Sequence, residues 1–98
     1  MGNIIVINPF EIPKGQEERA LAMWDNFAKY FRRQPGFVSS KLHRAINPNA
    51  RFHIVTVAEW ASQDHFMAAL KNPEFQRIKE TSTDYYPNYP ELYEIIRT

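Results

Sequence analysis

The chain contains no cysteine, which removes several kinds of chemistry from consideration. Disulfide bonds, a catalytic thiolate and cysteine metal sites are all excluded. A large excess of one charge is also missing, because 12 lysine and arginine residues against 11 acidic residues give a formal net charge of +1. So small a charge produces no long-range field toward nucleic acid or an acidic membrane. We therefore expect neither of these among the partners of the protein.

Long apolar segments are missing from the start of the chain. The apolar run over residues 4–7 is too short for a membrane span or a signal peptide, and no basic segment precedes it. We expect a cytoplasmic protein. Its 98 residues, of which 44% are hydrophobic, are enough for one small core but not for two. The sequence therefore predicts a single domain over residues 1–98.

Residues 52–60 form the most informative segment, because a strand here is apolar on both faces. Side chains alternate along a strand. One face carries Phe52, Ile54, Thr56, Ala58 and Trp60. The other carries Val55 and Val57 beside His53 and Glu59. The helices of so short a chain cover only one face, and a second copy of the chain is the simplest cover for the other. We therefore predict a homodimer.

The period of the apolar residues predicts the order strand, helix, strand, strand, helix, strand. Alternation predicts strands over residues 3–10, 37–46, 52–60 and 92–97. Three- and four-residue spacing predicts a helix over residues 16–33 and another through residue 70, with Ser62 as its N-cap. Pro73 interrupts this second helix, which we expect to resume over residues 74–79. The order is that of an α+β ferredoxin-like fold, a βαββαβ antiparallel sheet with the helices on one face.

The helix-covered face of this sheet carries polar residues that indicate a pocket. If the hairpin pairs symmetrically about its turn, His43 lies opposite Ile54 and shares a face with Thr56 and Trp60. Asn8 joins them from the first strand. A few polar groups on an apolar surface are typical of a ligand site. Because an imidazole titrates near neutrality, His43 is also a candidate general base.

Each candidate has a structural interpretation as well. His43 fits a hydrogen-bonded surface histidine, and a backbone carbonyl would suffice as the partner of Asn8. Trp60 fits a core anchor as well as a pocket wall. The aromatic stripe at helical spacing is more typical of a core than of a ligand site, and it consists of Trp24, Phe27 and Phe31. The three histidines fall on different faces or elements, so no metal site is expected at His43, His53 and His65. A cluster of tyrosines is expected to cover the dimer or its rim: Tyr85, Tyr86, Tyr89 and Tyr93.

Four features occur together in this chain: Asn8, Pro13-Lys14-Gly15, Gln34-Pro35-Gly36-Phe37 and Glu59-Trp60-Ala61-Ser62. In this combination the chain resembles the antibiotic biosynthesis monooxygenase family, over roughly residues 4–79. The resemblance implies a dimeric α/β barrel. The family includes cofactor-free quinone-forming monooxygenases, heme-degrading monooxygenases and enzymes of other small metabolites.

The heme-degrading branch has Asn8 in common with this chain. Its tryptophan and its heme-ligating histidine, however, correspond to Ala69 and Lys79. An ammonium group is a poor substitute for an imidazole ligand to iron, so the comparison implies that no heme site is present.

The quinone-forming branch has Trp60 in common with this chain. Its asparagine and its tyrosine correspond to Thr56 and Phe66. Thr56 keeps a hydroxyl that can donate to a substrate oxygen, whereas Phe66 can only stack. The pocket is similar in position and altered in chemistry.

The resemblance implies oxygenation of a small aromatic or polyketide-like phenol, anthrone or quinol by dioxygen, without a cofactor or metal. The substrate loses a proton and its carbanion passes an electron to dioxygen, so the protein supplies a dry cavity and donors for the developing oxyanion. The candidate catalytic residues are Asn8, His43 and Thr56, and the candidate substrate-binding residues are Trp24, Phe27, Trp60 and Phe66. The alternatives are a non-catalytic ligand-binding or structural dimer and, third, a heme-degrading monooxygenase.

Overall fold

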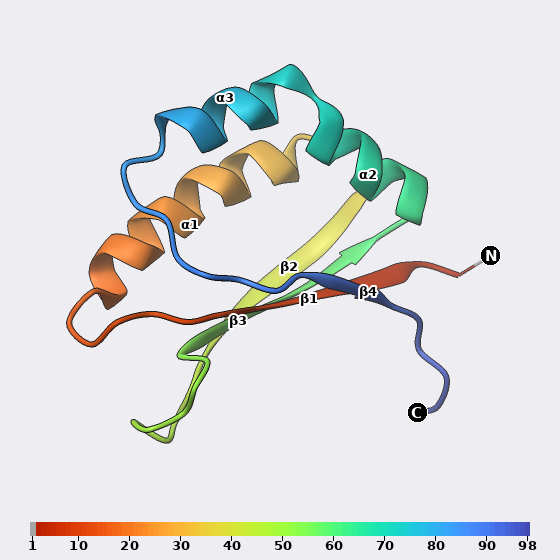
Figure 1. Ribbon diagram of the computed structural model, residues 1–98. Coiled ribbons are helices and arrows are strands. Elements are labelled where there is room, and N and C mark those ends of the chain that lie inside the picture. Colours follow the sequence, from red (N-terminus) through yellow and green to blue (C-terminus); the bar gives the residue numbers. More distant parts are fainter. Residues whose placement is uncertain (1) are drawn as a thin grey trace.

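Within residues 2–98, which this computed structural model describes, four strands form one sheet and three helices cover one of its faces (Figure 1). In chain order the elements are β1 (Ile4–Phe10), α1 (Glu17–Arg32), β2 (Phe37–Arg44), β3 (Ile54–Trp60), α2 (Gln63–Lys71), α3 (Pro73–Thr81) and β4 (Glu91–Tyr93). The strands are antiparallel, in the order β2-β3-β1-β4. This arrangement confirms the predicted ferredoxin-like α+β fold. Met1, which begins the segment expected to carry no targeting signal, lies outside the described residues.

The first two helices follow from an apolar stripe and from suitable terminal residues. α1 has acidic residues in its first turn and basic residues in its last turn, which complements the helix dipole. It buries Ala20, Ala28 and Tyr30 against the rest of the chain. α2 begins after Ser62, whose Oγ accepts the backbone N–H of His65 at 3.1 Å, so the predicted N-cap is confirmed. No helix within residues 2–98 has the length and apolar character needed to cross a membrane.

α2 and α3 meet at Asn72, where one helix ends and the next begins. Asn72 Oδ1 accepts the backbone N–H of Glu74 at 2.8 Å and so caps α3. Pro73 has no N–H to donate to the carbonyl four residues earlier. The hydroxyl of Tyr30 instead donates to that carbonyl, Ala69 O, at 2.7 Å. Because proline suits the first position of a helix, α3 begins at Pro73 and is longer than the predicted 74–79.

The β2–β3 hairpin pairs one residue away from the predicted register. His43 lies opposite Val55, and Leu42 lies opposite Thr56. The symmetric turn that we assumed pairs His43 with Ile54, but the actual loop is asymmetric and β2 also shifts register between residues 37 and 39. A shift of one residue moves every side chain of a strand to the other face. The predicted position of His43 was therefore wrong, because His43 is exposed on the face away from the helices.

All four strands are shorter than predicted, and β1 begins at Ile4 instead of residue 3. β2 ends at residue 44 instead of 46. β3 begins at Ile54, and His53 places its Nε2 2.5 Å from Glu17 Oε1 on α1 instead of facing away from the helices. β4 ends at Tyr93, which pairs with Ile5 near the start of β1. Beyond this pair, β1 has almost no residues left with which a further residue of β4 could pair. Residues 94–98 therefore lie outside any strand, although a strand was predicted over residues 92–97.

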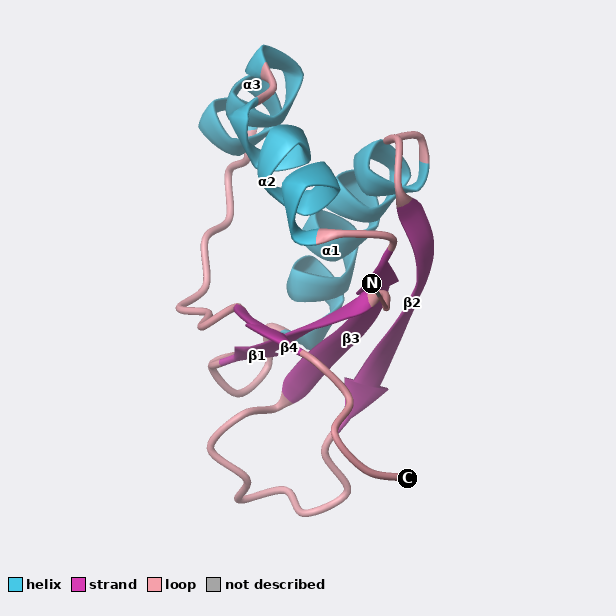
Figure 2. Ribbon diagram, turned by 90° about the vertical axis from the view of Figure 1, so that its right-hand side faces the viewer, coloured by secondary structure: helices cyan, strands magenta, loops and turns pink. Residues whose placement is uncertain are grey.

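The two faces of the sheet differ in their cover. The core lies between the helices and the face that they cover, and its largest fully buried side chains are Trp60, Tyr30 and Ile54. The opposite face, which we call the open face, has no helix over it (Figure 2). The residues of β1 and β3 that alternate onto it include Ile5, Ile7, Val55 and Val57. One face of the sheet is thus buried by this chain, and the other presents apolar side chains.

Candidate functional site

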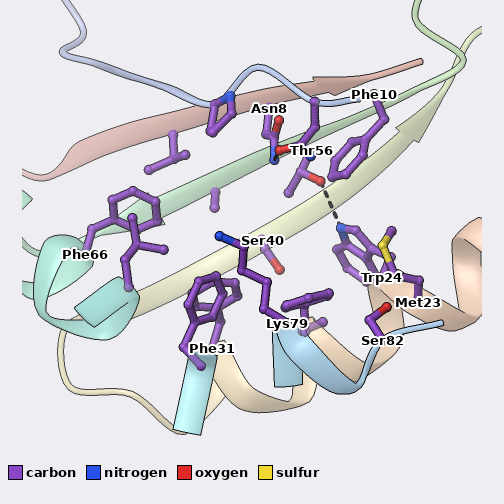
Figure 3. Close-up of a pocket in the computed structure, with 18 of the residues that line it drawn as sticks. Asn8, Phe10, Met23, Trp24, Phe31, Ser40, Thr56, Phe66, Lys79 and Ser82 are labelled. Carbon is purple, nitrogen blue, oxygen red and sulfur yellow. Dashed lines mark hydrogen bonds between the residues drawn. The ribbon is translucent and has the colours of Figure 1, made fainter. Parts of the chain in front are cut away.

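A cavity of about 440 Å³ lies between the covered face of the sheet and the helices (Figure 3). Its floor consists of alternate residues of β1 and β3: Val6, Asn8, Phe10, Thr56, Ala58 and Trp60. Its walls include aromatic residues of the three helices: Trp24, Phe27, Phe31, Phe66 and Phe75. A concave, largely apolar space with a few polar groups is the usual form of a small-molecule site.

Two polar side chains are neighbours on the cavity floor. Asn8 on β1 and Thr56 on β3 are directly opposed in the antiparallel pairing, and the side chains of such a pair share one face of the sheet. Thr56 Oγ1 accepts the indole N–H of Trp24 at 2.8 Å (Figure 3). This bond occupies the hydroxyl oxygen and leaves its hydrogen as a donor.

Asn8 is also bonded to the segment that follows α3. Its Oδ1 accepts the backbone N–H of Tyr89 at 3.1 Å, and its Nδ2 donates to Asn88 Oδ1 at 3.3 Å. A side-chain amide has two N–H hydrogens, so one of them has no acceptor among residues 2–98. Asn8 therefore combines a structural bond at the edge of the cavity with one remaining donor.

Residues 82–90, which we call the strap, connect α3 to β4 and form one side of the cavity (Figure 1). Tyr86 anchors the strap, because its ring is 3% exposed against Phe10 and its hydroxyl donates to Gln16 Oε1 at 3.0 Å. Asp84 forms an ion pair with Arg19 on α1. The prediction that Tyr86 covers the dimer or its rim was wrong, because the strap crosses the start of α1 and buries this ring in the core.

Trp60 connects the cavity floor to the hydrophobic core. It is 1% exposed and packs edge-on against Phe31, Phe37 and Phe66, with ring centroids 5.8, 5.4 and 5.4 Å apart. Edge-to-face pairs of this kind stabilise aromatic clusters. Trp60 is therefore a core anchor that also lines the cavity. Trp24 lines the same cavity but is only half-buried.

The histidines lie away from the cavity in the part of the chain that the structure describes. His43 is exposed on the open face. His53 contacts Glu17 on α1, and His65 contacts its N-cap, Ser62. Nor do residues 2–98 contain a group of three or more histidine, aspartate or glutamate side chains that could hold a metal ion.

An ion-pair cluster lies outside the cavity, at the start of α1. Glu17 accepts hydrogen bonds from Arg44 at 2.8 and 2.9 Å and contacts His53 at 2.5 Å. These partners, with Arg44 first, hold the pKa of Glu17 below its usual range. The cluster connects α1 to the β2–β3 hairpin and takes no part in lining the cavity.

Several cavity residues were not predicted from the sequence. Ser40 on β2, Phe75 and Lys79 on α3, and Asn88 on the strap all line it. Ser40 was missed because it pairs with Ala58 only in the shifted register. The four-residue spacing of Phe75 and Lys79 was a usable signal, since it places both on one side of a helix. Asn88 belongs to an irregular segment that carries no periodic pattern.

Comparison with known proteins places these features in a family. The sequence profile described as antibiotic biosynthesis monooxygenase matches residues 3–81. The chain belongs to the antibiotic biosynthesis monooxygenase family. A candidate monooxygenase from Shewanella loihica PV-4 is similar to this family member, with 30% identity and a TM-score of 0.84 over 99% of this chain and 97% of that one. A search among curated proteins found no match.

Two further solved structures share the fold of this family member. SnoaB, a cofactor-independent oxygenase from Streptomyces nogalater, is 24% identical with a TM-score of 0.83 over 100% of this chain and 97% of its own. A candidate antibiotic biosynthesis monooxygenase from Bordetella bronchiseptica is 21% identical with a TM-score of 0.81 over 99% of this chain and 100% of that one. At these identities the likeness shows the fold alone. The family profile and the Shewanella relative support a monooxygenase-like role.

Proposed function

We propose that the chain is a cofactor-independent monooxygenase that oxidises a planar aromatic or polyketide-like phenol, anthrone or quinol with dioxygen. The observation that carries this proposal is the opposed pair Asn8 and Thr56 on the floor of an aromatic cavity. Each of these two residues keeps one hydrogen-bond donor. The walls formed by Trp24, Phe27 and Phe66 suit the faces of a flat ring. A volume of about 440 Å³ is within the usual range for a small-molecule site.

The reaction needs an acidic hydrogen on the substrate and no further reductant. The substrate loses a proton to water, and its carbanion transfers one electron to dioxygen. The two radicals combine to a carbon-bound peroxide, whose O–O bond breaks with loss of water. For an anthrone, CH2 and O2 thereby become C=O and H2O. Asn8 and Thr56 would donate to the substrate oxygen on which negative charge develops, while the aromatic walls hold the flat ring of the substrate.

The general base predicted at His43 does not fit this geometry. His43 lies on the open face, on the other side of the sheet from Asn8 and Thr56. The proposal therefore relies on hydrogen-bond donors, which lower the pKa of a bound phenol or anthrone by stabilising its anion. In this mechanism the proton passes to water and not to a side chain of the protein.

Two comparisons support oxygenation without a cofactor over heme degradation. The relative SnoaB is described as a cofactor-independent oxygenase. The position of the heme-ligating histidine corresponds to Lys79, whose ammonium group has no lone pair for iron, and no histidine of residues 2–98 lines the cavity. Ala69, at the position of the heme branch's tryptophan, is buried in the core.

A specific observation also favours a second candidate, a non-catalytic ligand-binding dimer. Both polar atoms of the Asn8 amide are already bonded to the strap, and Thr56 Oγ1 is bonded to Trp24. In this case Asn8 and Thr56 fix the shape of the cavity and stabilise no developing charge. Such a protein would bind the aromatic molecule and consume no dioxygen.

We also propose that two copies of the chain associate through their open faces. Ile5, Ile7, Val55 and Val57 present an apolar surface that no helix of residues 2–98 covers (Figure 2). Burial of apolar area favours association, and a two-fold pair buries the same surface on both copies.

We infer that residues 1–98 form one domain and that the protein acts in the cytoplasm.

Oxygen uptake by the purified protein, free of metal and flavin, tests the proposed reaction. Wild type should consume dioxygen when given an anthrone or dihydroquinone, and the quinone product should appear by absorbance. Asn8→Ala should slow turnover about 100-fold, the usual loss for a well-aligned oxyanion donor. Asn88→Ala is the matched control, because it removes the acceptor of the Asn8 amide and keeps the amide itself.

Two results separate the interpretations, and a third variant tests the floor of the cavity. If Asn8→Ala stays folded and turns over as fast as wild type, Asn8 is structural and the ligand-binding dimer is preferred. If Asn8→Ala and Asn88→Ala are slowed equally, Asn8 acts by holding the strap. Thr56→Asn, which restores the residue of the quinone-forming branch, should raise activity or leave it unchanged.

A further inference from the structure

A cation lines the cavity on its helical side. Lys79 lies one turn after Phe75 on α3, and both line the cavity. Figure 3 shows the Lys79 side chain extending from α3 toward the sheet, with its amine facing the space above the floor. Lys79 forms no ion pair with another residue of the described range 2–98, in contrast to four arginines. Its ammonium group is therefore available to a ligand.

Two acidic residues near Lys79 are already paired with arginines. Asp84 on the strap also lines the cavity, but its carboxylate pairs with Arg19 and its side chain is 17% exposed. Glu74, earlier on α3, pairs with Arg33. The aromatic cavity is therefore lined by an exposed ammonium group that forms no ion pair within residues 2–98.

We propose that the ligand of this cavity is a planar aromatic molecule that carries a carboxylate, and that Lys79 pairs with this carboxylate. The aromatic walls bind the flat body of such a molecule, and the cation faces the same space. Asn8 and Thr56 on the floor then face a second oxygen of the ligand, as a carbonyl or hydroxyl. The inference rests on the proposed function only for the aromatic character of the ligand. Lys79 thus determines specificity for acidic over neutral aromatic molecules.

Binding of two matched compounds tests this inference without turnover. The 98-residue chain is titrated with anthraquinone-2-carboxylic acid and with its methyl ester, and tryptophan fluorescence reports the Kd of each. Wild type should bind the acid about 5- to 10-fold more tightly, which is the size expected of a partly solvated charge pair. High salt should reduce this preference.

Variants of two lysines identify the residue responsible. Lys79→Met should remove the preference for the acid, and Lys79→Arg should retain it. Lys71→Met is the matched control, because Lys71 is exposed like Lys79 but lies at the end of α2 and does not line the cavity, and its loss changes the net charge equally. Lys71→Met should keep the wild-type preference.

Each result has a distinct meaning. Equal affinity of wild type for acid and ester, or a Lys79→Met protein with full preference for the acid, overturns the inference and leaves the proposed oxygenation standing. If wild type binds neither compound, the inference is overturned, and so is the proposal that the ligand of the cavity is aromatic. Preference for the acid in a protein that shows no oxygen uptake supports the inference and rejects only the proposed reaction.

Discussion

Replacing Tyr30 by phenylalanine isolates one hydrogen bond at the junction of α2 and α3. Tyr30 is 0% exposed, and its hydroxyl donates to Ala69 O at 2.7 Å. The helical donor to that carbonyl would be the N–H of residue 73, but Pro73 has none. Tyr30→Phe therefore leaves a buried carbonyl without its partner while filling almost the same volume. The junction lies between Phe66 and Phe75, which line the cavity.

The expected cost is that of one unsatisfied buried acceptor. Such a loss destabilises a protein by about 1–3 kcal/mol. Phenylalanine lacks only the hydroxyl oxygen, so almost no void is added to this cost. For a domain of this size, a loss of about 2 kcal/mol lowers Tm by about 8–16 °C.

Urea unfolding followed by fluorescence measures this change. Protein concentration is held constant, because association would make the free energy of unfolding depend on it. Tyr86→Phe is the matched control, since its hydroxyl bonds the half-buried side chain of Gln16 at 3.0 Å and its loss should cost about 0.5–1 kcal/mol. A Tyr30→Phe protein as stable as wild type would refute the argument that this hydroxyl replaces the missing N–H of Pro73.

Three further changes test other features. Gly36→Ala should cost about 2–5 kcal/mol in thermal unfolding, because φ is +85° and a Cβ there would overlap His65. Val57→Asp should convert the proposed dimer to a monomer in sedimentation velocity, since a charge buried in the interface costs about 3–5 kcal/mol. If wild type is already a monomer at micromolar concentration, the proposed dimer is wrong. Arg44 lowers the pKa of Glu17 in the folded protein below its ordinary pKa of 4.5. The stabilisation that Glu17 contributes is therefore complete above pH 4.5 and is lost as the pH falls through the pKa of the folded protein. Acid unfolding of Glu17→Gln should lack this loss, and identical acid curves would contradict it.

The order of strands and helices was predictable, because each element buries one side and the period of its apolar residues identifies its type. The cap at Ser62 and the break before Pro73 were readable from local chemistry. The register of the β2–β3 hairpin could not be predicted, because neither the asymmetric loop nor the shift of register between residues 37 and 39 has a marker in the sequence. His43 was therefore placed on the wrong face.

The floor of the cavity and part of its aromatic walls were predictable, whereas its sides on α3 and the strap were not. Asn8, Thr56 and Trp60 follow from strand alternation, which holds over short distances in the sequence. Lys79 lies within the predicted helix over residues 74–79, but its side chain was not predicted to face the cavity, and Asn88 lies on the strap. The path of the strap depends on contacts with residues far away in the sequence, and local patterns carry no information about such contacts.

The hydrogen bond from Trp24 to Thr56 couples recognition of a ring to recognition of an oxygen atom. Because the indole N–H is satisfied within the protein, the orientation of Trp24 is fixed before a ligand binds, and its side chain loses little rotamer freedom on binding. If the Thr56 hydroxyl donates to a ligand, it accepts from Trp24 and donates in one continuous chain of hydrogen bonds. Each bond in such a chain polarises and strengthens the next. A ligand that offers both a flat face and a correctly placed oxygen should therefore bind more tightly than the sum of the two contacts measured separately.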